Sequence, residues 1–296
     1  MPAAAIIALR SAAIAVLLAL VTFFSSRLAT PRNLTPEVYW ETVMWGGGHV
    51  LQFASVAAML GVWTILIARS RGRAPVSRRA AVLIFAILLA PLFAAPLLPL
   101  LGPNTARTAF TRLMQLGIAP AVLVYMFLCV RGGRVPLGVV ASMVLTLVGF
   151  ALGASIRGPN TTIPAHYHAS IGAVTVAFMA ITVPLLEELG FAAPSARIGT
   201  VARYQPVLLG AGQLVFAVGF AMAGAHGMRR KAYGGEQQIR TATEWIGLGV
   251  MGIGGVVAIA GGVLFLFVAC AMWHRRIVKQ RSERGDTWLR STGFNG

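Results

Sequence analysis

Eight long apolar stretches divide this chain of 296 residues. Each is close to the roughly 20 residues that an α-helix needs to cross the hydrocarbon layer of a membrane. Backbone amides in lipid must find their hydrogen bonds within the segment, so the stretches are expected to be helices. We predict an all-α polytopic membrane helix bundle of about eight transmembrane helices, in which residues 1–296 form a single transmembrane domain. The stretches cover residues 3–25, 41–68, 79–101, 108–130, 136–155, 165–186, 206–226 and 245–273.

Composition agrees with a membrane protein and argues against a nucleic-acid partner. Hydrophobic residues make up 57% of the chain and charged residues 11%, and the mean hydropathy is +0.77. A net charge of +17 is compatible with nucleic-acid binding. The arginines, however, gather in short loops between the apolar stretches, which is the pattern of membrane topology signals. We therefore expect a membrane protein with no nucleic-acid partner.

The distribution of basic residues predicts the orientation of the chain. An even number of helices places both termini on one side, and the loops on that side carry more arginine than the others. Positive-inside bias then places both termini in the cytoplasm, in the inner membrane of a bacterium. The first stretch follows Met1 almost directly and has no basic start, so we interpret it as a retained helix. The basic segments are 69–79, 131–134, 197–203 and a tail from Arg275 to Arg290.

Two of the five histidines, His166 and His168, begin the sixth apolar stretch. Residues two apart on an α-helix are separated by roughly 200° around its axis. The two imidazoles are therefore expected on opposite faces, where they cannot easily bind one metal but can each bind a different one. The alternative is a pair of surface histidines at the membrane interface.

A third histidine, His49, lies within the second stretch, about 12 Å from its outer end. An ionisable residue at membrane depth is by default a functional-site hypothesis. Gly46, Gly47 and Gly48 lack side chains beside it, so a bulky group could approach closely. The alternative is a histidine hydrogen-bonded to a neighbouring helix, with the glycines serving helix packing.

These motifs together resemble subunit I of the haem–copper oxidase superfamily. That family carries a His-aromatic-His followed by a Ser-x-Gly-Ala-Val run, as His166 to Val174 do here, and a Trp-x-x-Gly-His that matches Trp45 to His49. The resemblance covers essentially the whole chain but only the last eight of the twelve helices of the family. Further matches in the same order are Arg107, Phe110, Thr111, Pro120 and the run from Gly227 to Lys231.

The resemblance implies two haems and a catalytic metal. His166 would bind the high-spin haem and leave its other face open towards His49, while His168 would bind the low-spin haem. Arg229 and Arg230, or Arg230 and Lys231, would hold the haem propionates. His49 would be the catalytic metal ligand, for copper or iron. The implied function is reduction of oxygen or nitric oxide with electrons from a cytochrome, such as cytochrome c, or a quinol. The partners would be other respiratory subunits, including a separate chain that supplies the first four helices.

Several positions depart from the family pattern. Ala95 and Pro96 stand where the family has a His-His pair, so the chain supplies at most one of three copper ligands. A single imidazole does not hold copper firmly. Val50, Leu51 and Phe53 also replace residues of the family's proton and oxygen chemistry. Two alternatives therefore stay open: a degenerate haem-binding subunit that transfers electrons or senses gas, and a haem-free transporter or structural membrane protein.

Overall fold

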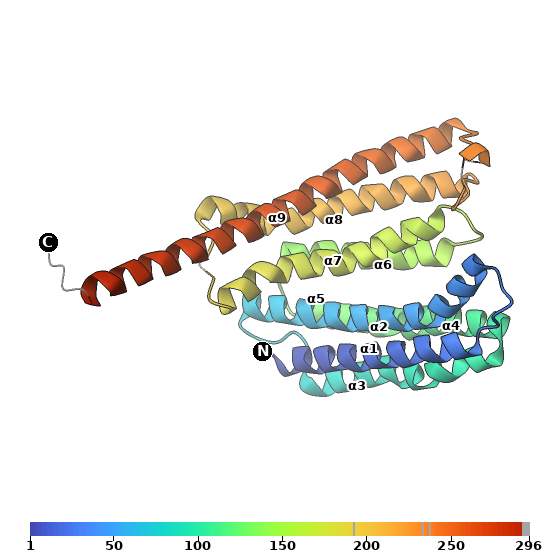
Figure 1. Cartoon of the computed structure of the whole chain (residues 1–296), viewed down its shortest axis with the longest axis horizontal. Helices are drawn as coiled ribbons and strands as arrows, with labels where there is room; N and C mark the ends of the chain where they lie inside the picture. The colour runs from blue at the N-terminus through green and yellow to red at the C-terminus, as the bar shows by residue number, and fades with distance from the viewer. Residues whose placement is uncertain (192, 233, 237, 292–296) are drawn as a thin grey trace. The chain divides into compact units, whose positions relative to one another are not determined.

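Helices fill nearly the whole chain (Figure 1). The computed structural model describes residues 1–191, 193–232, 234–236 and 238–291, with side chains up to Arg276, so most of the predicted basic tail lies outside the described side chains. Among these described residues, eight helical segments are long and apolar enough to cross a membrane, which confirms the predicted polytopic bundle. They are Ala3–Ala29, Pro36–Arg71, Arg78–Leu101, Pro103–Val130, Leu137–Ser155, Thr162–Glu188, Ala196–Ala225 and Ala242–Arg276.

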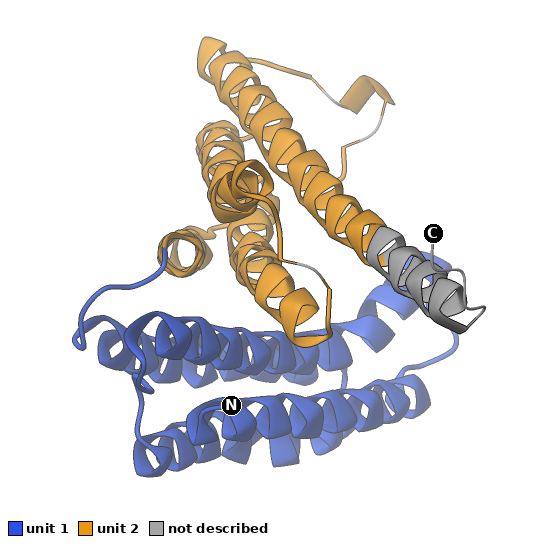
Figure 2. Ribbon diagram, turned by 90° about the vertical axis from the view of Figure 1, so that its left-hand side faces the viewer, with its two compact units in different colours: residues 1–136 blue, residues 137–296 orange. Residues whose placement is uncertain are grey.

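The chain divides into two compact units, residues 1–136 and residues 137–296 (Figure 2). Each unit has its own set of packed helices. The first holds the His49 motif, and the second holds the His166 and His168 motif together with the basic run after Gly227. Whether both units belong to one transmembrane domain, as the sequence predicts, stays a prediction.

Unit 1 is built around its second helix. The elements in order are α1 (Ala3–Ala29), α2 (Pro36–Arg71), α3 (Arg78–Leu89), the 3₁₀ helix η1 (Ala90–Leu101), α4 (Pro103–Gly117) and α5 (Ala119–Val130). The apolar window of α2 is 67% buried, against 33–39% for the other spans of the unit, so α2 is its central helix. Phe53, Trp63 and Ile67 are among its fully buried side chains.

Proline and glycine explain where the helices of unit 1 begin and end. Pro36 opens α2, where a missing backbone N–H costs nothing, and Gly72 closes it with a φ of 71°. The third predicted span changes from α to 3₁₀ geometry at Ala90, because Pro91, Pro96 and Pro99 lack the N–H that an α-helix needs. Ala95 and Pro96 therefore lie in a 3₁₀ segment.

Unit 2 packs its helices as sequential neighbours. The elements are α6 (Leu137–Ser155), α7 (Thr162–Glu188), α8 (Ala196–Ala225), the 3₁₀ turn η2 (Gly234–Glu236) and α9 (Ala242–Ser291). Helix α7 contacts both α6 and α8, and α8 pairs along much of its length with α9. The histidine motif on α7 therefore lies between two neighbouring helices.

A line of glycines joins α8 to α9. A Cβ atom added at Gly212, Gly219 or Gly254 would clash with the backbone of the facing helix. Small residues of this kind let two membrane helices approach closely, and a seven-residue spacing keeps them on one face. The glycines of this line are Gly212 and Gly219 on α8 and Gly247, Gly254 and Gly261 on α9.

Candidate functional site

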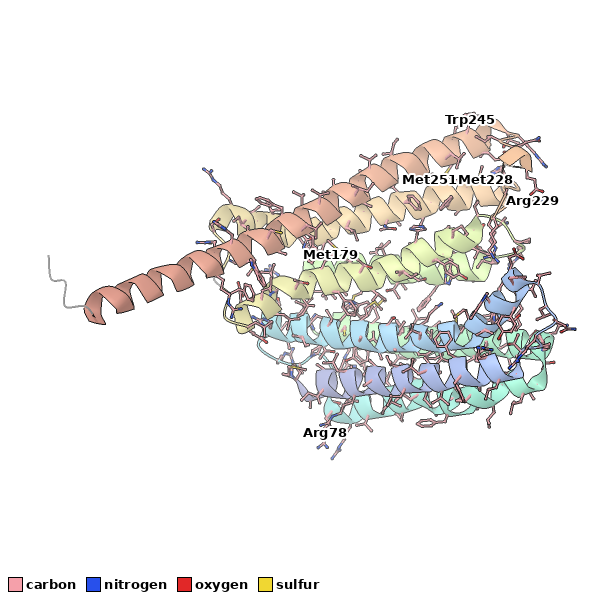
Figure 3. The ribbon with its side chains drawn as sticks, viewed as in Figure 1. Arg78, Met179, Met228, Arg229, Trp245 and Met251 are labelled. Carbon is pink, nitrogen blue, oxygen red and sulfur yellow. The ribbon has the colours of Figure 1, made fainter. Side chains whose placement is uncertain are left out.

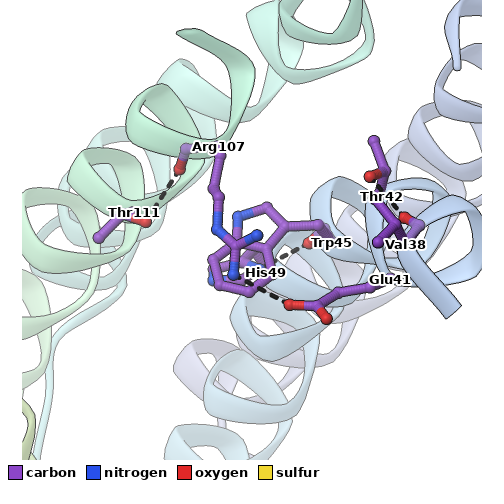
Figure 4. Close-up of polar contacts among 7 residues, drawn as sticks. All are labelled: Val38, Glu41, Thr42, Trp45, His49, Arg107 and Thr111. Atoms are coloured by element: carbon purple, nitrogen blue, oxygen red, sulfur yellow. Dashed lines mark hydrogen bonds and ion pairs between the residues drawn. The ribbon is translucent and has the colours of Figure 1, made fainter. Parts of the chain in front are cut away.

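The His49 side chain lies on α2 beside Trp45 (Figure 4). Its Nδ1 lies 2.6 Å from the backbone oxygen of Trp45, one turn earlier on the same helix. A carbonyl oxygen only accepts, so Nδ1 carries the proton and Nε2 keeps the lone pair. The ring centroids of His49 and Trp45 are 4.6 Å apart. The orientation of His49 is thus set chiefly by its own helix.

Arg107 from α4 completes this side of unit 1 (Figure 4). Its guanidinium lies 4.0 Å from the centre of the Trp45 ring, and its Nη2 donates to Glu41 at 2.9 Å. The indole Nε1 of Trp45 is buried and has no hydrogen-bond partner among the described residues. The charge of Arg107, which lies over the ring of Trp45, is already paired with the carboxylate of Glu41 in the same unit.

The three glycines beside His49 do not share one role. A Cβ at Gly46 would lie 2.6 Å from the Phe110 ring, and one at Gly47 would clash with Phe23. Of the three, Gly48 alone faces open space. Gly46 and Gly47 therefore serve packing against α4 and α1, as the alternative interpretation holds, and room for a bulky group remains at Gly48.

The surroundings of His49 do not fit a copper centre. The described residues contain no group of three or more histidines, cysteines, aspartates or glutamates that could hold a metal ion. Ala95, at the position of the expected His-His pair, is fully buried within η1. Because one imidazole alone is a weak copper site, no chemical step through copper is derived from these residues.

His166 is oriented by a neighbouring helix. Its Nδ1 donates to the backbone oxygen of Gly149 on α6 at 2.7 Å, which leaves Nε2 with the lone pair. A Cβ at Gly153, one turn further along α6, would lie 3.1 Å from the His166 ring. Gly149 and Gly153 therefore provide the acceptor and the space that hold this imidazole.

His168 faces the other neighbour of α7. Its Nδ1 lies 3.2 Å from Oε1 of Gln213 on α8, and its ring centroid lies 4.3 Å from that of Phe216. The two histidines thus contact different helices, as their spacing predicts. Here too the bonded Nδ1 leaves Nε2 as the nitrogen able to bind a metal.

The loop after α8 brings basic residues to the start of α7. The backbone N–H of Thr161 donates to the oxygen of Met228 at 3.0 Å, and the N–H of Arg230 donates to the oxygen of Pro159 at 3.3 Å. Arg229 also forms an isolated antiparallel bridge with Asn160. Figure 3 labels Met228 and Arg229 in this loop. Since α7 begins at Thr162, the loop is joined to the chain about 6 Å along the helix axis from His166 and about 9 Å from His168.

The basic residues of this loop are consecutive in sequence, and Glu236 is the acidic residue of the same α8–α9 connection. Residues 226–232 include Arg229, Arg230 and Lys231 and no aspartate or glutamate. Lys231 has a φ of 57°, a left-handed conformation that is uncommon for a side-chain-bearing residue. In the described part of the chain, the guanidinium groups of Arg229 and Arg230 make no hydrogen bond to another residue. Paired guanidinium groups suit a carboxylate ligand through bidentate hydrogen bonds.

Sequence reasoning missed the residues that orient the two histidines. The fifth apolar stretch carries no predicted site residue, yet it contributes Gly149 and Gly153. Their four-residue spacing, on a helix adjacent in sequence to the histidine motif, is the signal that could have found them. Gln213 and Phe216 could not be found this way, because only the packing of α8 on α7 brings them to His168.

Comparison with known proteins gives relatives but no activity. No family model and no solved structure matches the chain. An uncharacterized protein of Aquifex aeolicus is 27% identical over 175 residues, covering 57% of this chain and 44% of the relative. Uncharacterized protein RP382 of Rickettsia prowazekii is 25% identical over 285 residues, covering 78% of this chain and 54% of the relative. The chain spans about half the length of these curated relatives.

Proposed function

We propose that this chain is a haem-binding membrane subunit for electron transfer or gas sensing, with His166 as a ligand of a high-spin haem and His168 as a ligand of a low-spin haem. One observation carries the proposal: two imidazoles on α7 face different helices, and each has its Nδ1 hydrogen-bonded. Haem iron is commonly held by a neutral imidazole, and the second nitrogen of such a ring usually donates to a carbonyl or carboxylate. The resemblance to haem–copper oxidase subunit I supports the same assignment.

The hydrogen bonds on Nδ1 have a defined chemical role. Donation from His166 to the Gly149 carbonyl fixes the tautomer and ring plane, and it makes Nε2 more basic. Gln213 does the same for His168 through a longer contact. A bound haem would supply one-electron transfer. The chain itself contributes oriented ligands and the polarity around them, which are the protein's means of setting a redox potential.

The basic loop at the start of α7 fits the propionate end of a haem. Backbone contacts of residues 228–230 join this loop to residues 159–161, which precede both histidines in the sequence. The basic residues of the loop are Arg229, Arg230 and Lys231. Carboxylates hydrogen-bond strongly to guanidinium forks. We therefore assign these three cations to haem propionates, with Arg229 and Arg230 as the stronger pair.

We also propose that another chain completes the site at His168. The cavity at this residue measures about 170 Å³, below the roughly 300 Å³ of the smallest pockets that enclose a drug-sized ligand. Tyr167 and Ile171, which line it, are exposed. Another respiratory subunit would cover a haem bound here and would contribute residues that hold it.

A second candidate function is the reduction of oxygen or nitric oxide, with cytochrome c or a quinol as electron donor. The observation that favours it is His49, whose bonded Nδ1 leaves Nε2 available beside the open face of Gly48. Its single imidazole does not make a copper site. The first candidate, electron transfer or gas sensing by bound haem, is therefore the function that the geometry supports best.

The test is a reduced-minus-oxidised difference spectrum, with and without carbon monoxide, of the full chain purified from its native membrane with its co-purifying subunits. We expect His166→Ala to remove the carbon-monoxide-sensitive signal and His168→Ala to remove the low-spin signal. His226→Ala is the matched control, because His226 is exposed at the end of α8 and bonds Met222 of its own helix.

Two outcomes decide between the alternatives. Absence of haem from every preparation would overturn both haem functions and favour a transporter or structural protein. Haem without turnover of oxygen or nitric oxide, and without a second metal by elemental analysis, would leave the electron-transfer or gas-sensing function alone.

We further propose that the chain lies in the inner membrane of a bacterium with both termini in the cytoplasm. The arginine-rich loops support this through the positive-inside bias. Reporter fusions at residue 73 and residue 230 test it, because these positions are expected on opposite sides. A cytoplasmic signal at residue 230 would contradict the orientation.

A further inference from the structure

Two adjoining cavities open at the end of unit 1 where α1 begins and α2 ends. They measure about 510 and 280 Å³, and both are lined by Ala74, Pro75, Leu128 and Arg131. The larger also reaches Ala3 and Ala4 of α1 and Ser77 and Arg78 before and in α3. The smaller adds Arg71, Arg73 and Gly132. Cavities that share one wall, including one arginine, can hold two parts of a single ligand.

The charge of these cavities has one sign. Four arginines line them: Arg71, Arg73, Arg78 and Arg131. The acidic residues of unit 1 are Glu37 and Glu41. Both belong to the first two turns of α2, about 45–50 Å along that helix from Arg71. The ligand that this charge selects is an anion.

The basic walls are held in place by the protein itself. Arg71 donates from Nε to the Arg134 oxygen at 2.7 Å and from Nη2 to the Gly133 oxygen at 2.5 Å. Arg73 donates from Nη2 to the Gly132 oxygen at 3.4 Å. These bonds fasten the end of α2 to the loop after α5. Arginines that serve only as membrane topology signals would not need hydrogen bonds that hold their side chains in place.

The position of the cavities in the unit limits the anion further. They lie at the ends of membrane-spanning helices, and their walls include the apolar side chains of Ala3, Ala4, Val76 and Leu128. Basic pockets between transmembrane helices are suited to the headgroups of acidic lipids. We propose that this end of unit 1 binds an anionic phospholipid with two phosphate groups, of the diphosphatidylglycerol type, one phosphate in each cavity with Arg131 between them. This inference is independent of the proposed haem function.

The test is native mass spectrometry of the full chain in detergent, titrated with tetraoleoyl diphosphatidylglycerol. The cavity variant is Arg78→Gln with Arg131→Gln, and the control variant is Arg79→Gln with Arg134→Gln. Both remove two charges from the same end of unit 1, but Arg79 and Arg134 do not line either cavity. We expect lipid affinity to fall about tenfold or more in the cavity variant and less than about threefold in the control.

Folding is checked separately for this pair of variants. Arg78 lies in the first turn of α3, where a positive charge opposes the helix dipole, so its neutral replacement does not weaken the helix. Helix content by circular dichroism checks both variants. If the cavity variant is not recovered folded, Arg131→Gln alone replaces it, and we expect it to weaken binding about threefold or more because both cavities share this residue.

Three results would overturn the proposal. Equal loss in the two double variants would show general electrostatic attraction and no built site. Equal binding of phosphatidylcholine or of singly phosphorylated phosphatidylglycerol would exclude selection for two phosphates. If inorganic pyrophosphate displaced the bound lipid as effectively as an equal concentration of free lipid does, the cavities would be assigned to a water-soluble anion. Selective loss in the cavity variant, with weak competition by pyrophosphate, supports the lipid site.

Discussion

His49 and His166 both lie on membrane-spanning helices beside glycines, but the glycines act differently at the two sites. In unit 2, Gly149 and Gly153 of α6 give His166 its hydrogen-bond acceptor and its space. In unit 1, the Phe110 ring occupies the space beside Gly46, and the hydrogen bond of His49 is with the backbone of its own helix. The imidazole of His166 is thus oriented by tertiary packing, which is what a cofactor ligand requires.

The basic residues beside the two sites differ in whether a carboxylate of the same unit pairs with them. Arg107 in unit 1 pairs with Glu41 and stacks on Trp45, so its charge is compensated within the unit. The guanidinium groups of Arg229 and Arg230 in unit 2 make no hydrogen bond to another described residue, and the carboxylate of the same α8–α9 connection is that of Glu236. The comparison teaches that unit 1 completes its own polar contacts around His49. Unit 2 instead offers oriented donors and cations to an external ligand.

Removing the aromatic ring beside His49 is expected to have the largest effect on stability. Phe110 is 2% exposed, and Phe→Ala in a protein core costs about 3–5 kcal/mol. In a membrane the unfolded reference state also keeps the ring in lipid, so we expect about 3 kcal/mol for Phe110→Ala. Unfolding in mixed micelles measures the change. Phe127→Ala on α5 is the control, because Phe127 is 59% exposed and should cost under about 1 kcal/mol.

A second substitution sharpens this result. Gly46→Ala places a methyl group against the Phe110 ring, and overpacking of this kind costs about 1–3 kcal/mol. In the Phe110→Ala background the same change should cost much less, since the ring is gone. Strictly additive costs would contradict the assignment of Gly46 to helix packing.

Filling the glycine beside His166 is the next largest change. A side chain at Gly149 meets the backbone N of Ser170 at 3.3 Å, so Gly149→Leu must separate α6 from α7. We expect a loss of about 2 kcal/mol in the free energy of unfolding and a loss of the carbon-monoxide-sensitive haem signal. Gly48→Leu is the matched control, because a side chain at Gly48 meets nothing within 4 Å. Equal effects of the two substitutions would erase the difference between the two sites.

The sequence predicted the helices well because apolar length alone decides whether a segment can cross a membrane. Its errors fall where other forces act. The second helix begins at Pro36, five residues before the predicted apolar start, because Pro36 and Glu37 are favourable residues for the first turn of a helix. The third span becomes 3₁₀ at Ala90, where its prolines interrupt α geometry. The heptad of glycines from Gly247 to Gly261 was visible in the sequence, but its partner face on α8 was not.

The histidine pair shows the limit for the site. Their opposite faces follow from two-residue spacing and helix geometry, so they were predictable. The acceptors of their Nδ1 atoms lie 17 and 45 residues away, on α6 and α8. Only helix packing selects such partners, and one sequence carries little information about it. The assignment of haem to these residues stays a prediction that spectroscopy must test.

The compensated charge in unit 1 should matter slightly for stability. Arg107 is 51% exposed and Glu41 35%, and exposed ion pairs contribute less than about 1 kcal/mol. We expect a double-mutant cycle of Arg107→Gln and Glu41→Gln to give a coupling of about 0.5 kcal/mol.

Arg229→Gln with Arg230→Gln should change stability by less than about 0.5 kcal/mol but shift the haem midpoint potential. If this double substitution lowered the free energy of unfolding by more than the coupling energy of Arg107 with Glu41, the loop arginines would have partners within the protein. That result would contradict the difference drawn between the two units.

A similarly small effect on stability is expected from the contact of His168 with Gln213. Gln213→Leu keeps the side-chain volume that packs against Gly172 and removes the acceptor of the 3.2 Å bond. We expect a stability change of about 0.5 kcal/mol, since a hydrogen bond contributes little net free energy. The low-spin haem should still bind, but its midpoint potential should rise, because an imidazole without this acceptor is less basic and stabilises ferric iron less.

Redox titration followed at the low-spin band measures that shift, and the carbon-monoxide-sensitive signal of His166 serves as an internal reference. Thr175→Val is the control variant, because Thr175 lines the same cavity while its hydroxyl bonds Ile171 of its own helix. An equal shift in both variants would show a general change of polarity and no specific role for Gln213. A shift confined to Gln213→Leu would show that α8 sets the ligand strength of His168, as α6 does for His166, and would extend tertiary orientation to both histidines of unit 2.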